Sequence, residues 1–146
     1  MMSAMFDLSG RVALVSGAAS GMGRAMSIAL AEAGADVMLV GRNLAGVEKT
    51  AGEIEKLGRR AVAVQCDVSQ PDQIRAMFGQ LDRDFGRIDF LGNVAGDAVL
   101  GKPEEIPLDA IEKTWRNLVY GRFCACQEAG RRMLADRKST RLNSSH

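Results

Sequence analysis

Short apolar segments alternate with longer segments of helical periodicity along most of this 146-residue chain. Each of the first three expected helices is followed directly by a glycine, the residue that commonly ends a helix. Strands alternating with helices of about 10 to 15 residues imply a parallel sheet with right-handed crossovers. We therefore predict an α/β fold with a doubly wound parallel sheet. The expected strands are 11–16, 36–41, 60–68 and 88–96, the expected helices are 21–33, 44–57 and 71–85, and the glycines are Gly34, Gly58 and Gly86.

The C-terminal part of the chain is expected to form one long helix from Asp109 to about Leu134, bent where Gly121 and Gly130 weaken it. Asn43 is the expected N-terminal cap of the helix over 44–57. No linker or internal repeat divides the chain, so we expect one domain.

Composition and charge exclude several classes of partner. The formal net charge is +1, with basic and acidic residues interspersed, so nucleic acid is not an expected partner. No apolar stretch approaches the roughly 20 residues that span a bilayer, and the first 17 residues lack a basic region followed by a long apolar run. We expect a cytoplasmic protein with no membrane contact.

The cysteine and histidine content argues against a metal centre. The three cysteines, Cys66, Cys124 and Cys126, are odd in number, and we expect buried, reduced thiols. The one histidine is the last residue, His146. No metal site is therefore expected.

A glycine-rich segment, Ser16–Gly23, joins the first strand to the first helix. Glycine tolerates the sharp turn and lets a pyrophosphate approach the backbone, while free N–H groups at the helix start bind negative charge. Glycines also serve tight turns for structural reasons alone, but the placement in the first strand-helix-strand unit favours a dinucleotide site. The expected cofactor-binding residues here are Gly17, Ser20, Gly21, Met22 and Gly23.

This segment resembles the glycine motif T-G-x-x-x-G-x-G of the short-chain dehydrogenase/reductase family, with Ser16 in place of threonine. Three further segments resemble family motifs in the same order. They are Cys66-Asp67-Val68 after the third strand, Asn93-Val94-Ala95-Gly96 after the fourth, and Arg116-Asn117-Leu118 followed by Gly121 and Phe123 in the long helix.

The resemblance implies a Rossmann-type fold and an NAD(P)-dependent oxidoreductase that transfers a hydride between a nicotinamide cofactor and a carbonyl or alcohol substrate. It implies that the Asp67 carboxylate holds the adenine amino group and that Asn117 supports a water molecule in a proton relay. The further cofactor-binding residues that it implies are Val68, Asn93, Ala95 and Gly96.

The end of the second strand bears on the choice of cofactor. An acidic residue there would bind the ribose hydroxyls, but the chain has Arg42 and Asn43, and a guanidinium accommodates a 2′-phosphate. NADP(H) is favoured over NAD(H), although Arg42 could also be an ordinary exposed loop charge. The missing acid also argues against an S-adenosylmethionine methyltransferase on a similar sheet.

The catalytic set of the resembling family is largely missing. That family uses a serine and a Tyr-x-x-x-Lys element, whereas the one tyrosine here, Tyr120, is followed at the fourth place by Cys124. We expect Tyr120 to be a packing residue and Asn117 to be the one catalytic residue present. The alternative to an oxidoreductase fragment is a stand-alone nucleotide-binding module without catalysis.

The last eleven residues, 136–146, are polar, without periodicity, and resemble a translated sequencing adapter read codon by codon. We therefore expect residues 1–135 to be an incomplete NAD(P)-binding domain, truncated after about four strands and the long helix, and 136–146 to be an artefactual tail; a natural exposed tail is the alternative. The strand at 88–96 would then be a sheet edge. The resemblance to the short-chain dehydrogenase/reductase family implies that the parent protein is a homo-oligomer.

Overall fold

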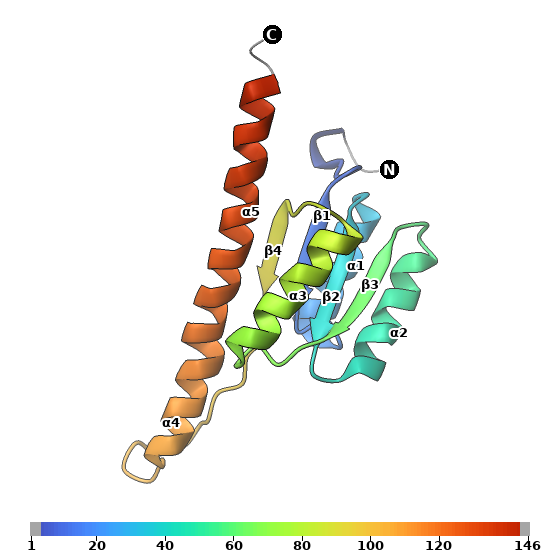
Figure 1. The fold of residues 1–146 in the computed structure, drawn as a ribbon. Coiled ribbons are helices and arrows are strands. Elements are labelled where there is room, and N and C mark those ends of the chain that lie inside the picture. The colour runs from blue at the N-terminus through green and yellow to red at the C-terminus, as the bar shows by residue number, and fades with distance from the viewer. Residues whose placement is uncertain (1–3, 144–146) are drawn as a thin grey trace.

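The computed structural model describes residues 4–143, with the backbone alone at Ala4 and at 138–143. Four parallel strands form one sheet in the order β3-β2-β1-β4 (Figure 1). The predicted fold class is confirmed. The strands are β1 (Val12–Ser16), β2 (Asp36–Gly41), β3 (Ala61–Gln65) and β4 (Phe90–Asn93).

Helices connect the strands and continue beyond the last one. Asn43 caps its helix as predicted, because its side chain accepts a hydrogen bond from the Gly46 N–H at 3.2 Å. Gly34, Gly58 and Gly86 all have positive φ, as expected of residues that follow a helix. The helical segments are η1 (Ala4–Phe6), α1 (Gly21–Glu32), α2 (Leu44–Glu55), α3 (Pro71–Asp84), α4 (Leu108–Trp115), the π-helical η2 (Arg116–Gly121) and α5 (Arg122–Asn143).

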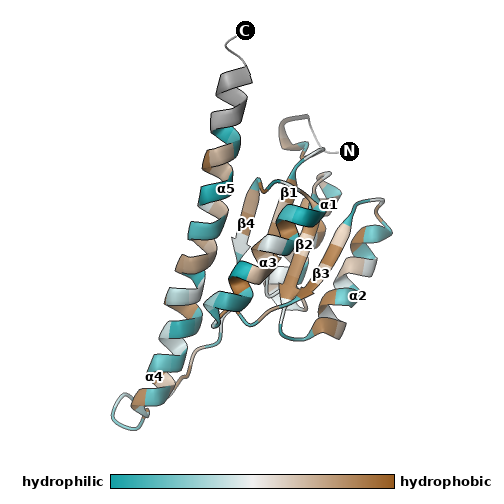
Figure 2. Ribbon diagram, viewed as in Figure 1, coloured by the Kyte–Doolittle hydropathy of each residue, from teal (hydrophilic) through white to brown (hydrophobic). Residues whose placement is uncertain are grey.

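Two apolar cores lie on the two faces of the sheet. Alternate side chains of a strand point to opposite faces, so Leu14 lies in one core and Val15 in the other. Residues of α3 and α5 complete the Leu14 core, and residues of α1 and α2 complete the Val15 core. Figure 2 shows the strands as predominantly hydrophobic, as expected for a sheet covered on both faces.

Two strands are shorter than predicted. The segment 60–68 is predicted to be a strand and 88–96 a strand that runs into a loop, whereas β3 ends at Gln65 and β4 at Asn93. The residues after these ends leave the sheet and form loops beside a cavity, which the apolar pattern alone does not distinguish from strand. β4 pairs with β1 and, among the described residues, lies at an edge of the sheet, as expected.

The long C-terminal helix differs from its prediction in two ways. It is helical from Leu108 to Asn143, and its middle turn is a π-helix rather than a bend at glycine. The helix also continues into the segment expected to lack regular structure, up to Asn143, and extends well beyond the sheet (Figure 1). The last three residues, including His146, lie outside the described residues.

Tyr120 does not pack as predicted. Tyr120 is 61% exposed and lines an open hollow together with Ser69 and Pro71 at the start of α3. In the part of the chain that the structure describes, no helix is both long enough and apolar enough to cross a membrane.

Candidate functional site

A cavity of about 460 Å³ opens where the chain leaves the carboxyl ends of the strands. This edge of an open α/β sheet is where such folds bind ligands. The walls come from five segments that are far apart in the sequence. The lining residues are Gly17, Ala19, Ser20, Met22, Gly23, Gly41, Arg42, Asn43, Cys66, Val68, Val94, Ala95, Gly96, Asp97 and Asn117.

Two glycines bring three backbone segments together at the floor of this cavity. A Cβ on Gly23 would lie 2.1 Å from the Gly17 carbonyl oxygen, so only glycine fits there. Gly17 has a φ of +72°, and a Cβ on it would lie 2.9 Å from the Ala95 nitrogen. The glycine-rich segment therefore packs backbone against backbone, which leaves the cavity side free of side chains.

The N-terminus of α1 faces the cavity through Ser20, Met22 and Gly23. Ser20 occupies the N-cap position of α1. In the part of the chain that the structure describes, the Ser20 side chain makes no capping hydrogen bond, and the first turn of α1 contains no acidic residue. The first N–H groups of a helix have no intrahelical partner, and the helix dipole gives them positive potential. This end of α1 fits an anionic group such as a pyrophosphate.

Buried hydroxyl groups hold the glycine-rich segment in place. The Thr50 hydroxyl of α2 donates to the Ala18 carbonyl at 2.9 Å, and the Ala18 N–H donates to the Val40 carbonyl at 3.1 Å. The sequence analysis missed Thr50, because a single threonine on a helix carries no signal of a contact more than 30 positions away in the chain.

The Ser16 hydroxyl connects the end of β1 to the loop after β4. It accepts hydrogen bonds from the N–H groups of Val94 at 3.2 Å and Ala95 at 3.1 Å, and it donates to the Gly92 carbonyl at 3.3 Å. The Ser16 side chain is buried, so these bonds are shielded from water. Ser16 thus positions Ala95 and Gly96 at the cavity wall, a role that the motif comparison alone did not assign.

Arg42 lies at the cavity rim and forms an ion pair with Asp97. Both side chains are 60% exposed. The Arg42 carbonyl also accepts a hydrogen bond from the Gln65 side-chain amide at 3.1 Å. The predicted residues Arg42 and Asn43 both line this cavity, and so does Asp97, whose only sequence signal is its position directly after the Asn93–Gly96 segment.

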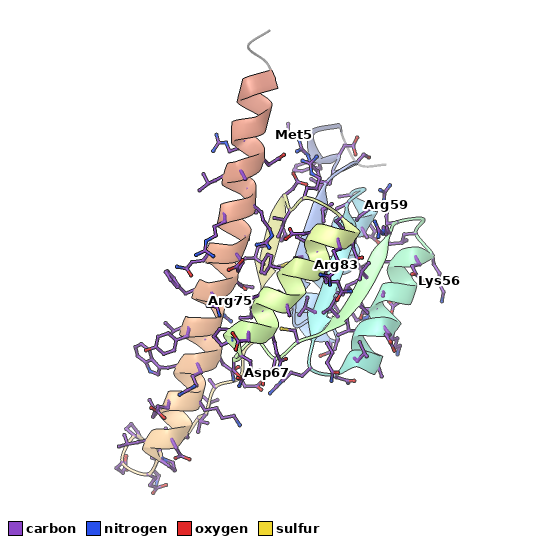
Figure 3. All side chains as sticks on the ribbon, viewed as in Figure 1. Met5, Lys56, Arg59, Asp67, Arg75 and Arg83 are labelled. Carbon is purple, nitrogen blue, oxygen red and sulfur yellow. The ribbon has the colours of Figure 1, made fainter. Side chains whose placement is uncertain are left out.

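Asp67 lies beside the main cavity rather than in its lining. It lines an adjoining hollow of about 380 Å³ together with Arg42, Gln65 and Gln73. Its Oδ1 accepts from the Ser69 N–H at 2.9 Å, and its own N–H donates to the Gln73 side chain at 2.8 Å. Figure 3 labels Asp67 near the start of α3, at the same edge of the sheet as the cavity.

Asn93 and Gly21 also stand outside the lining. The Asn93 amide donates to the Arg122 carbonyl at 3.4 Å and to the Cys126 sulfur at 3.3 Å, so it ties β4 to α5. Gly21 begins α1 with a φ of +55°. Asn93 acts here through its side chain and Gly21 through its backbone, and the structure brings the other predicted residues except Asp67 into the lining of one cavity.

Asn117 reaches the cavity from the π-helical turn η2. Its side chain is buried and lines the cavity. The backbone of η2 passes so close to the loop after β3 that a Cβ on Gly121 would lie 1.8 Å from the Val68 carbonyl oxygen. The wider π-turn and Gly121 together seat Asn117 beside Val68, and such turns are frequent at functional sites.

The cysteines are free thiols, as expected, but they are not all buried. Cys66 and Cys124 are buried, whereas Cys126 is exposed. Burial, with smaller contributions from the Asp67 charge and Cys124, raises the pKa of the Cys66 thiol to about 11. Cys66 therefore remains protonated at neutral pH, so it lines the cavity as an uncharged side chain and is not a nucleophile. The described residues contain no cluster of three or more metal-ligating side chains.

Residues 11–142 match the short chain dehydrogenase family model. D-threitol dehydrogenase of Mycolicibacterium smegmatis is 40% identical over 88% of this chain and 50% of its own length. L-rhamnose 1-dehydrogenase (NAD(P)(+)) of Sphingomonas is 33% identical over 87% of this chain and 50% of its own length.

Solved structures agree with this match. A short-chain type dehydrogenase/reductase from Mycobacterium marinum superimposes with a TM-score of 0.86 at 37% identity, covering 90% of this chain and 52% of that one. A short chain dehydrogenase from Burkholderia cenocepacia in complex with NADP gives 0.82 at 36% identity, covering 86% and 51%. The chain spans about half the length of the curated relatives that it matches. With the glycine-lined cavity at the expected edge of the sheet, these matches show that the chain belongs to the short-chain dehydrogenase/reductase family.

Proposed function

We propose that this chain is the dinucleotide-binding part of an NAD(P)-dependent oxidoreductase that moves a hydride between the cofactor and an alcohol or carbonyl carbon. The observation that carries the proposal is the cavity at the N-terminus of α1. Gly17 and Gly23 line this cavity with backbone alone, because neither position has room for a side chain. The dehydrogenases named above act on small polyols and sugars, which supports a small alcohol or carbonyl compound as the substrate class.

The residues present fit such a cofactor. The open N–H groups at the start of α1 would bind the pyrophosphate, and the backbone of Ala95 and Gly96 would form the opposite wall. Asp67, in the adjoining hollow, would receive the adenine amino group. The bound nicotinamide would supply the hydride chemistry, while the Asn117 amide would hold a water molecule at the cavity wall.

The cofactor is proposed to be NADP(H) rather than NAD(H), on the strength of Arg42. Its guanidinium stands at the cavity rim at the end of β2, and a neighbour of similar structure was solved with NADP. A guanidinium can bind a phosphate by two parallel hydrogen bonds.

Titration of the purified chain with each dinucleotide, followed by calorimetry, tests this assignment. Arg42→Ala should weaken NADP⁺ binding by about tenfold, the loss expected for a charge-assisted hydrogen bond, and leave NAD⁺ binding within about twofold. Arg75→Ala is the matched control, since Arg75 is 59% exposed and paired with an acid but lies away from the cavity. An unchanged NADP⁺ affinity in Arg42→Ala would refute the preference.

Catalysis by the chain as given is not expected. Its one tyrosine has no lysine four positions later, and Tyr120 is exposed and not among the cavity residues. A stand-alone nucleotide-binding module is therefore the second candidate. Recovering the gene separates the two: a reading frame that replaces residues 136–146 and continues into a serine and Tyr-x-x-x-Lys supports the oxidoreductase, whereas a native stop supports the module. A cytoplasmic, homo-oligomeric parent enzyme is proposed with the first candidate.

A further inference from the structure

The ion pair between Arg42 and Asp97 joins two strands that are not neighbours. Arg42 directly follows β2, and Asp97 stands in the loop after β4, while β1 lies between these strands in the sheet. Neighbouring strands are about 4.8 Å apart, so the pair crosses roughly two strand spacings. The glycine-rich segment that follows β1 lines the same cavity as both members of the pair.

Arg42 is the residue that the main cavity shares with the hollow containing Asp67. Its side chain is 60% exposed, and Asp97 is its charged partner. The guanidinium donates to Asp97 through Nη2, and a phosphate bound at the end of β2 by two parallel hydrogen bonds would compete for that donor and for the same charge. The two anions therefore compete for one cation.

We infer that Asp97 is a specificity-determining residue: its carboxylate competes with the 2′-phosphate of NADP(H) for Arg42 and so lowers the preference for NADP(H) that Arg42 confers. The inference rests on the proposed function. NAD(H) has no 2′-phosphate and does not need the guanidinium, so its binding does not require that the pair break.

The test is a double-variant cycle on the full 146-residue chain, with Asp97→Asn, Arg42→Ala and both together, titrated separately with NADP⁺ and NAD⁺ by calorimetry. Asparagine keeps the size of the side chain and removes its charge. Asp97→Asn should tighten NADP⁺ binding by about two- to fivefold, the range expected on removing an exposed ion pair, with NAD⁺ binding unchanged. In the Arg42→Ala background the same substitution should have no effect.

Glu105→Gln is the matched control, because Glu105 forms an exposed ion pair with Lys102 at 3.1 Å and its replacement changes the net charge equally. Circular dichroism and thermal unfolding of every variant verify that each one is folded. Equal tightening of both dinucleotides by Asp97→Asn, the same gain in Glu105→Gln, or a gain that persists without Arg42 would each overturn the inference.

The outcomes also separate this inference from the proposed function. If the unmodified chain binds NADP⁺ but Asp97→Asn does not alter the affinity, the specificity role of Asp97 is wrong and the proposed function stands. If no variant binds either dinucleotide, the proposed function is wrong and the role of Asp97 is refuted with it.

Discussion

At the scale of single residues, the missing side chain of Gly23 is a tight constraint on the glycine-rich segment. Alanine there would place its Cβ 2.1 Å from the Gly17 carbonyl oxygen. The position of the Cβ is fixed by the Gly23 backbone and the oxygen is itself a backbone atom, so the segment would have to move. We expect Gly23→Ala to lower the free energy of unfolding by about 1 to 3 kcal/mol, as overpacking usually does. NADP⁺ affinity should fall by about tenfold or more, because the displaced N–H groups no longer converge.

Gly52→Ala is the control for this prediction. Gly52 lies within α2, and a Cβ there would meet nothing within 4 Å. Alanine should stabilise that helix by about 0.5 to 1 kcal/mol. Urea unfolding and dinucleotide titration of both variants provide the measurement. Equal changes in unfolding free energy and in NADP⁺ affinity for Gly23→Ala and Gly52→Ala would show that the close contact at Gly23 does not matter.

The sequence could predict the site residues that share a local motif, and it could not predict those that act from a distance. Gly17 and Gly23 belong to a spacing that only a close approach of backbone explains. Thr50 holds the same segment, yet nothing in its own helix indicates a partner at Ala18. Asp97 acts on the site through its ion pair with Arg42, and the order of the strands brings these two residues together.

At the scale of secondary structure elements, the π-helical turn η2 is the feature that periodicity missed. Gly121 in this turn packs against the loop after β3. A Cβ on Gly121 would lie 1.8 Å from the Val68 carbonyl oxygen, so only glycine fits there. We expect Gly121→Ala to lower the free energy of unfolding by about 3 kcal/mol, at the upper end for overpacking against backbone. It should also displace Asn117 from the cavity wall.

Gly130→Ala provides the comparison within the same long helix. A Cβ on Gly130 would meet nothing within 4 Å, so this variant should gain about 0.5 to 1 kcal/mol from the helix preference of alanine. Chemical denaturation monitored through Trp115 measures both. Similar losses in the two variants would show that helix continuity, rather than the contact with Val68, governs the stability of this region.

The strand and helix order followed from the sequence, whereas several element ends did not. Apolar periodicity and the glycines after the helices determine where β1, β2 and the first three helices lie, because those residues bury one face. The stretch from Cys66 to Val68 is also partly apolar, but it forms cavity wall. A pattern of apolar residues reports burial, and it does not report whether a sheet or a ligand site buries them.

The contact between α3 and α5 should make stability depend on acid pH. Arg132 donates two hydrogen bonds of 2.6 Å to the Asp82 carboxylate, and these bonds lower the pKa of Asp82 from its ordinary value of 3.8. The folded protein thus favours the charged carboxylate. Its stabilising contribution is complete above about pH 4 to 5 and is lost as the pH falls through the lowered pKa. Because Asp82 is half-exposed, the contribution is below about 1 kcal/mol.

Unfolding free energies at a series of pH values check this prediction. The stability difference between the unmodified chain and Asp82→Asn should shrink as the pH falls from about 5 to 2. Arg132→Gln should remove the same part of the pH dependence, because Arg132 is the cause of the lowered pKa. A difference that stays constant over this range would show that Asp82 contributes through packing and not through its charge.

At the scale of the whole molecule, several apolar side chains of the long helix are exposed to solvent. Phe123 is 63% exposed and Tyr120 61% exposed, with Trp115 and Val119 on the neighbouring turns. β4 adds the backbone groups of a sheet edge. Clustered exposed apolar residues mark an interaction surface, and uncovered strand edges favour association. The molecule is therefore expected to associate with itself in solution.

Sedimentation velocity at a series of concentrations tests whether this helix face is responsible. The double variant Tyr120→Ser/Phe123→Ser should shift the population towards the monomer, while its free energy of unfolding changes by less than about 1 kcal/mol because both side chains are exposed. Phe6→Ser/Leu57→Ser removes two exposed apolar side chains elsewhere and should leave association unchanged. If both double variants reduce association equally, general hydrophobicity is the cause. If neither does, association uses another surface, such as the edge of β4, whose backbone groups stay exposed when the helix is substituted.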